Sequence, residues 1–221
     1  MNSVVRILLS PTPEQRARLL ALQESFAQVC NALAPMVQQT RVWNRVALHH
    51  MAYKGLRERY PALGSQMVCN AIYSVSRAAR IVFQAPGSPF HHARFVGKPL
   101  PLLRFSDNCP VYFDRHTLSL KGTQASMYTL DGRMRFELAL SPEASQAFHT
   151  RRLLEIILQR QEEGFSLTFS FDSLAAPAVP GSVIPKRPVE RADSAGETPI
   201  EAVGPYGLAP MPQYLQVEES T

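Results

Sequence analysis

The spacing of apolar residues changes near the middle of this chain, and that change constrains the fold more than any other feature of the sequence. From about residue 13 to residue 84, apolar side chains recur every three or four positions, which is the period of an amphipathic helix. From residue 102 to residue 171 they mostly alternate with polar side chains, as in half-buried strands. The sequence therefore predicts a helical block followed by a group of strands.

The first residues predict a strand and then a well-defined helix start. Residues 3–9 are β-branched and apolar, as in a short buried strand. Thr12 can cap the following helix, Pro13 suits its first turn, and Gln15 completes a capping box. Pro35 is expected to kink or end this helix. One apolar face is expected at Leu19, Leu22, Phe26, Val29 and Leu33.

Two more helices are predicted, over about residues 42–60 and 64–84. The apolar stripe expected for the first is Val42, Val46, His49, Tyr53 and Leu56. The stripe expected for the second is Val68, Ile72, Val75, Ala79 and Val82. The opposite side of the second helix carries Asn70, Tyr73, Arg77 and Arg80 at helical spacing. Its ring and guanidiniums suit stacking and phosphate contact, and a solvent-facing side with Tyr73 partly packed would look the same.

Beyond a break at residues 85–89 the pattern predicts short strands and one more helix. The strands are expected at residues 102–105, 111–114, 117–121, 126–130, 134–140 and 165–171. Asp131-Gly132 predicts a hairpin turn. The helix is expected over residues 143–163, with Gly164 after its end.

This order predicts an α+β fold, with a small antiparallel β-barrel and a helical block inserted after its first strand. Residues 1–10 and 91–172 would form the barrel domain, and residues 11–90 the inserted helical domain. Residues 173–221 hold eight prolines and four glycines with few periodic apolar positions, which predicts a disordered tail.

The charge is distributed unevenly along the chain. Residues 1–105 hold thirteen Lys and Arg against three Asp and Glu, whereas residues 106–172 hold seven against nine. A strongly basic first half indicates an anionic partner, with nucleic acid as the first candidate. A basic face that is only solvated would have the same composition.

Motifs for catalysis or metal binding are absent from the sequence. There is no phosphate-binding P-loop, no dinucleotide fingerprint, no nucleophile elbow and no His-Glu-x-x-His motif. His49-His50 and His91-His92 lack a second ligand pair at zinc spacing, so structural roles are expected. We expect no enzymatic activity, no metal and no cofactor.

The compartment follows from apolar runs and cysteines. No apolar run reaches 18 residues, and the first residues lack the long apolar stretch of a signal peptide. Cys30, Cys69 and Cys109 are widely spaced, which predicts neither a disulfide framework nor a thiolate zinc site. A cytoplasmic protein without a membrane partner is expected.

Several stretches of the chain resemble the N-terminal half of the TnpB family, the transposon-encoded RNA-guided nucleases related to type V CRISPR effectors. Residues 6–15 resemble the family's opening R-L-Y-P-T-P-E-Q segment. A second likeness is to the recognition helices of the family, at residues 43–44, 48–49, 56–63 and 65–79. A third is to the strands of its wedge barrel, at residues 104–105, 111–122 and 130–133. The resemblance covers about residues 3–172 and implies a wedge with recognition helices that hold RNA.

The chain departs from the family after the strand predicted at residues 165–171. In the family this strand leads into a RuvC-like nuclease domain that opens with Asp-x-Gly. Here Asp172 is followed by Ser173 and Leu174 and then by the Pro-rich segment. Because two-metal cleavage needs carboxylates to hold the ions, we expect this chain not to cut nucleic acid by itself.

Two kinds of function remain open. In the first, a nuclease-less protein binds a structured, guide-like RNA, with duplex DNA as a further partner, as a regulator or beside a separately encoded nuclease subunit. The candidate contact residues are Arg41, Arg45, Lys54, Arg57, Arg59, Asn70, Tyr73, Arg77, Arg80, Lys98 and Arg104. In the second, the helical block docks onto another protein. A truncated, non-functional transposase fragment would show the same sequence features.

Overall fold

The computed structural model describes residues 3–162, 164–172 and 211–219. In chain order these residues form β1 (Ser3–Leu8), α1 (Pro13–Thr40), α2 (Arg45–Arg59), α3 (Ser65–Ala79), the π-helix η1 (Arg80–Gln84), the 3₁₀-helix η2 (His92–Phe95), β2 (Leu102–Phe105), β3 (Val111–Phe113), β4 (Leu118–Lys121), β5 (Gln124–Thr129), β6 (Gly132–Glu137), α4 (Pro142–Thr150), β7 (Leu153–Gln161), β8 (Gly164–Phe171) and β9 (Leu215–Glu218). No helix in these ranges is long and apolar enough to cross a membrane.

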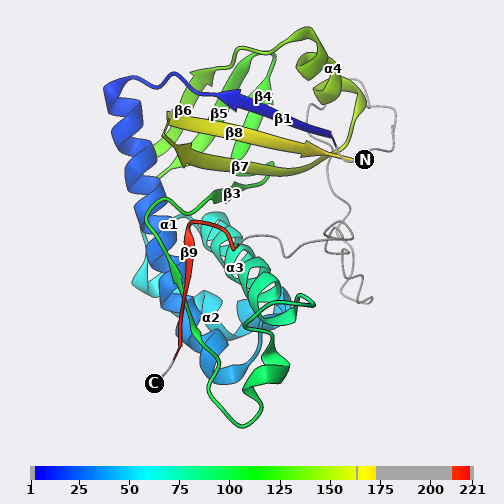
Figure 1. Cartoon of the computed structure of the whole chain (residues 1–221). Helices are drawn as coiled ribbons and strands as arrows, with labels where there is room; N and C mark the ends of the chain where they lie inside the picture. The colour runs from blue at the N-terminus through cyan, green and yellow to red at the C-terminus, as the bar shows by residue number, and fades with distance from the viewer. Residues whose placement is uncertain (1–2, 163, 173–210, 220–221) are drawn as a thin grey trace.

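The predicted α+β class is confirmed, with the helical block placed after the first strand. The described strands form three antiparallel sheets, in the orders β1-β8-β7-β3, β4-β5-β6 and β2-β9. They do not show a closed barrel. In Figure 1 the two larger sheets and α4 gather at one end, α2, α3 and η2 lie toward the other, and α1 runs along one side between them.

The start of α1 forms as its sequence predicts, but its end does not. The Thr12 side chain accepts a hydrogen bond from the Gln15 backbone, and Gln15 caps the Thr12 backbone in return. Of the two outcomes expected at Pro35, a kink or an end of the helix, the second was wrong, since α1 continues to Thr40. Residues on both sides of the proline, Ala34 and Val37, are buried, and this packing offsets the hydrogen bond that proline cannot make.

The apolar stripe of α2 differs from the prediction. Leu48, Ala52 and Leu56 are buried, whereas Val46 is 59% exposed. The predicted stripe included His49 and Tyr53 because they stand at helical spacing with Leu56. In the structure these two rings are only partly buried and stack on each other, with centroids 4.6 Å apart. In α3 and η1, by contrast, all five predicted stripe residues are buried.

The prediction of a helix over residues 143–163 was wrong. The helix α4 ends at Thr150, and residues from Leu153 onward form β7, paired with β8 on one side and β3 on the other. Two features favour the strand: Ile156 and Leu158 are buried at alternating positions, and β8 supplies a full-length partner. The glycine predicted to follow a helix, Gly164, instead begins β8 after the β7–β8 turn.

The remaining strand predictions are confirmed to within a few residues at their ends. Gly132 has a φ of 90° where β5 turns into β6, which explains the glycine there.

The tail prediction was wrong at one segment. Residues Leu215–Glu218 form β9, which pairs antiparallel with β2, so that Leu215 lies opposite Phe105 and is only 4% exposed. A strand of four residues has too few positions to show a period, and β2 provides the edge that orders it. The rest of the predicted tail, residues 173–210, lies outside the described residues.

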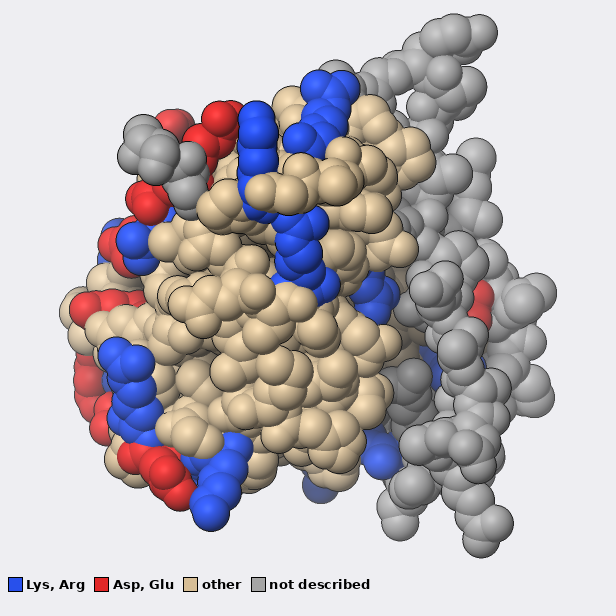
Figure 2. Space-filling view, turned by 90° about the horizontal axis from the view of Figure 1, so that it is seen from below, with Lys and Arg blue, Asp and Glu red and all other residues tan. Residues whose placement is uncertain are grey.

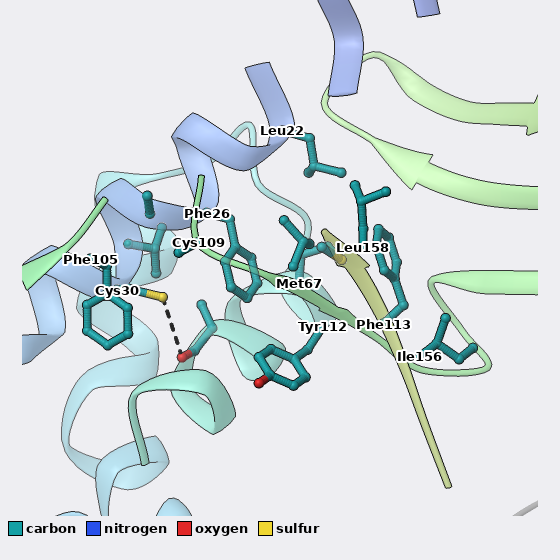
Figure 3. Close-up of a cluster of buried hydrophobic side chains, with 14 of the residues drawn as sticks. Leu22, Phe26, Cys30, Met67, Phe105, Cys109, Tyr112, Phe113, Ile156 and Leu158 are labelled. Carbon is teal, nitrogen blue, oxygen red and sulfur yellow. Dashed lines mark hydrogen bonds between the residues drawn. The ribbon is translucent and has the colours of Figure 1, made fainter. Parts of the chain in front are cut away.

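One continuous hydrophobic core joins the sheets to the helices. Figure 3 shows Phe26 of α1, Met67 of α3 and Phe113 of β3 pointing into one cluster. Cys30 and Cys109 are buried in the same region, and the Cys30 Sγ–H points to the Ala71 carbonyl at 3.9 Å. The helices therefore pack against the sheets through a common core, which places the elements that carry the side chains discussed below.

Candidate nucleic-acid interface

The described residues 41–105, called the basic end below, carry half of the Lys and Arg of the described chain and almost no Asp or Glu. They contain α2, α3, η1, η2, β2 and the connecting loops. Their ten cations are Arg41, Arg45, Lys54, Arg57, Arg59, Arg77, Arg80, Arg94, Lys98 and Arg104, against a single carboxylate, Glu58. Figure 2 looks at this side of the molecule and shows Lys and Arg over the face, with Asp and Glu gathered toward one side.

Only two of these ten cations form ion pairs within the described part of the chain. Arg77 pairs with Glu155 of β7 at 3.3 Å, and Arg104 pairs with Glu218 of β9 at 3.0 Å. Both carboxylates come from outside the basic end. The other eight cations have no carboxylate of the described residues within ion-pair distance, so their charge is not neutralised locally.

The predicted polar side of α3 is a seam between the helices and the sheet. Asn70 is only 6% exposed, with its amide against the Met67 sulfur at 4.0 Å. The Tyr73 hydroxyl donates to Glu155 Oε1 at 2.9 Å, and Arg77 Nη1 donates to the same oxygen at 3.3 Å. The expectation that this side of the helix carries accessible contact residues was therefore wrong at Asn70, whereas Tyr73 is partly packed, as the second alternative predicted. Tyr73 and Arg77 join α3 to β7 through Glu155, whereas the side-chain contact of Asn70 lies within α3 itself.

Burial at this seam changes the ionisation of its phenols. Burial, together with the charge of Glu155, raises the pKa of Tyr73. Burial, together with Tyr214, raises the pKa of Tyr112, whose ring packs edge-on against Tyr73 with centroids 5.4 Å apart. Both phenols stay protonated at neutral pH, which keeps the Tyr73 hydroxyl a donor to Glu155.

Two other predicted residues shape loops while keeping their charge. Arg41 ends α1 in the left-handed conformation, with φ of 56°, and its Nη2 donates to the carbonyls of Phe95 and Lys98. The Arg57 guanidinium donates to the Leu63 carbonyl after α2. Arg41 remains exposed at the surface, so it fixes the loop around η2 and contributes positive charge there.

Arg45 and Arg59 lie over tyrosine rings. The Arg45 Cζ is 5.3 Å from the centroid of Tyr73, and the Arg59 Cζ is 5.4 Å from that of Tyr60. A cation–π contact restricts a guanidinium without using its N–H donors, which stay available for phosphate oxygens. Both arginines are exposed.

The last predicted residues are Lys54, Arg80, Lys98 and Arg104. Lys54 and Lys98 are exposed and Arg80 is partly exposed, and their charged groups have no partner among the described residues. Arg104 is exposed but holds Glu218 of β9. Sequence reasoning missed one comparable cation, Arg94 of η2, which is also exposed and lies two residues after the His91-His92 pair.

Sequence reasoning also missed a row of aromatic rings at the basic end. The Trp43 ring centroid lies 5.8 Å from that of His92, and the His92 centroid lies 4.5 Å from that of His91. The ring of Trp43 also packs near that of the buried Phe83, with the two ring centroids 6.0 Å apart. Trp43 and the histidines are almost fifty positions apart, so no local motif could have joined them.

Metal and cavity chemistry are limited in the described residues. No group of three His, Cys, Asp or Glu side chains there is placed to hold a metal ion. Burial and the neighbouring Cys109 raise the pKa of Cys30, which keeps this thiol un-ionised and unreactive. One open cleft of about 520 Å³ lies between α1 and the end of α2, lined by Gln28, Asn31, Ala32, Arg59 and Tyr60.

No family model matches the chain, and no curated protein shows a significant match to it. The resemblance to the N-terminal half of TnpB proteins therefore stays a prediction.

Proposed function

We propose that this protein binds a structured RNA through the basic end and does not cleave it. The observation that carries the proposal is the ratio of ten cations to one carboxylate over residues 41–105, with eight of the cations outside any ion pair of the described chain. Clustered, unneutralised cations repel one another, and a polyanion offsets that repulsion.

The geometry favours contact with the nucleic-acid backbone. Arg45 and Arg59 are held over rings with their donors open, and Arg41 stiffens the loop that bears Lys98. Guanidinium groups form paired hydrogen bonds with phosphate oxygens, so fixed arginines lower the entropy lost on binding. Duplex DNA is a further ligand of the same chemistry, and the protein would act as a regulator or beside a separately encoded nuclease.

A titration with a labelled hairpin RNA at two salt concentrations tests the proposal. With five or more phosphate contacts, the affinity measured by fluorescence anisotropy should fall roughly a hundredfold or more between 50 and 200 mM KCl. Binding weaker than micromolar at low salt, or an affinity that does not change with salt, would contradict it. In the same samples with Mg²⁺ the RNA should stay intact, and cleavage would contradict the non-enzymatic part.

Protein docking remains a second candidate because of one observation on α2. Val46 and Met51 are 59% and 46% exposed, which gives the outer side of this helix an apolar character beside its cations. Replacing both with serine should leave RNA affinity within twofold if the cations carry the function. A large loss of RNA affinity in this variant would show that apolar contacts on α2 matter.

A further inference from the structure

The row formed by Trp43, His92 and His91 lies on the surface of the basic end. His92 is exposed, and Trp43 and His91 are partly exposed. The ring of His92 stands between the other two, inclined by 51° to Trp43 and by 34° to His91. The three rings therefore form a short, partly open array and are not enclosed in the core.

Hydrogen bonds from well-packed elements hold the row in place. Trp43 Nε1 donates to Gln84 Oε1 of η1 at 3.2 Å, and the Trp43 carbonyl accepts from Ser76 Oγ of α3 at 2.6 Å. His91 Nδ1 accepts from the Ala93 backbone at 3.3 Å, at the start of η2. The rings are thus ordered before any ligand arrives, which lowers the entropy lost on stacking.

Cations flank the row in sequence, and the carboxylate of the basic end is remote from it in sequence and along α2. Arg94 and Lys98 follow the histidines within the same loop, and Arg41 donates to two carbonyls of that loop. Trp43 precedes the first turn of α2, whereas Glu58 lies in its last turn. Flat rings beside unneutralised cations match a planar base attached to a phosphodiester.

We propose that the row of Trp43, His92 and His91 stacks on an unpaired nucleobase, while the neighbouring cations hold the flanking phosphates. This inference rests on the proposed function and narrows the class of ligand. A base can stack on the rings only when it is unpaired and turned outward from its duplex or loop. The ligand is then a single-stranded or looped segment, in RNA or DNA, and a fully paired duplex engages only the cations.

The chain offers a direct probe, since Trp43 is its only tryptophan. Its fluorescence is followed at low salt while the full-length protein is titrated with a ten-residue adenosine RNA, its DNA equivalent, a blunt RNA duplex and inorganic polyphosphate. Stacking should quench Trp43 with both single strands. The duplex should quench less, and polyphosphate should bind without quenching because it has no bases. The RNA and DNA arms show which sugar is preferred.

A pair of histidine variants provides the matched test. His92→Ala should lower the affinity for the single strands by roughly fivefold or more, as expected for the loss of one base-stacking contact, with polyphosphate affinity unchanged. His50→Ala removes another exposed histidine of the basic end, which has no ring contact with the row among the described residues, and should change either affinity less than twofold.

The outcomes separate this inference from the proposed function. Salt-dependent binding of single strands with unchanged Trp43 emission and no effect of His92→Ala would overturn the stacking site and leave RNA binding intact. Equal quenching by polyphosphate would also overturn it, because quenching would then need no base. If no nucleic acid binds at low salt, both proposals fail together.

Discussion

The two ends of this molecule differ in how many carboxylates accompany their Lys and Arg. In residues 106–172, seven Lys and Arg are balanced by nine Asp and Glu, and guanidiniums are used inside the chain. Arg133 donates to the His116 carbonyl and to Ser126, and Arg160 pairs with Asp107 at 3.3 Å. The basic end has ten cations and one carboxylate, although Arg41 and Arg57 also donate to backbone carbonyls. The two ends therefore differ in the carboxylates that accompany their cations, and not in the number of ion pairs. This excess of cations is the observation on which we propose that the basic end binds an anionic ligand.

The two ends nevertheless share one core, and its disruption should give the largest effects. Phe26 of α1 and Phe169 of β8 are both fully buried, and each change to alanine should lower the free energy of unfolding by about 3–5 kcal/mol. Urea denaturation followed by circular dichroism and by Trp43 fluorescence should give coincident transitions in both variants, because the core is continuous.

The control is Leu154→Ala, at a position that is 50% exposed, and its effect should stay within about 0.5 kcal/mol. If Phe169→Ala shifts the transition seen by circular dichroism but not the one seen by Trp43, the two ends unfold independently.

Charge reversal should separate the two ends most clearly in binding. The variant of the basic end replaces three exposed cations with glutamate, at Lys54, Arg94 and Lys98. Its RNA affinity should fall by roughly a hundredfold at 50 mM salt. The plot of log affinity against log salt concentration should become less steep, with the magnitude of its slope smaller by about three. Fluorescence anisotropy measures both.

The matched variant carries the same change in net charge at the other end, at Lys121, Arg135 and Arg152, which are also exposed. Its affinity should change less than threefold. Equal losses in the two triple variants would show that only the total charge matters and that the basic end is not a site.

The seam between the two ends should have a moderate effect on stability. Glu155→Gln removes the charge that accepts hydrogen bonds from Tyr73 and Arg77, and should lower the free energy of unfolding by about 1–2 kcal/mol. RNA affinity should stay within twofold, since the Glu155 side chain is largely buried and none of the eight unpaired cations forms an ion pair with it. Glu162→Gln, at an exposed position, serves as the control and should be neutral. A loss of RNA affinity with unchanged stability would contradict this expectation and would show that Tyr73 and Arg77 take part in RNA binding.

Alkaline pH should have the smallest effect. The pKa of Cys30 is raised in the folded protein, so the unfolded chain releases this proton first as pH rises. Stability is therefore constant below the ordinary thiol pKa and should fall by about 1 kcal/mol between pH 8 and pH 9.5 from this group. Chemical denaturation of Cys30→Ala across that range should show a shallower decline, and an identical decline would exclude Cys30 as its source.

Local signals predicted the elements whose own residues determine them. The capping box at Thr12 satisfies helix N–H groups within one turn. The stripe that runs through α3 and η1 has five members at regular spacing, so both features could be predicted from the sequence. The element after Ser141 was harder, because the residues that become β7 also suit a helix. The strand forms since β8 and β3 are available on its two sides.

The candidate site was predictable in its charge but not in its arrangement. The cations of the basic end are visible in the sequence, and Lys54 and Lys98 are exposed as expected. No pattern of neighbouring residues shows that Glu155 lies beside α3 and bonds to Tyr73 and Arg77. None shows that the ring of Trp43 contacts that of His92. These contacts join residues about fifty to eighty positions apart, and a pattern within one helix does not contain them.

By itself, the amino-acid sequence determined the α+β order of elements, the start of α1, the buried stripe of α3 and the excess of cations before residue 106. These properties depend on neighbouring residues and on composition, which act over one or two turns of chain. Only the tertiary structure decided which cations stay unpaired, which side of α3 is hidden and which rings form a row. Each of these depends on which surfaces the common core brings together, and that packing is a property of the whole fold.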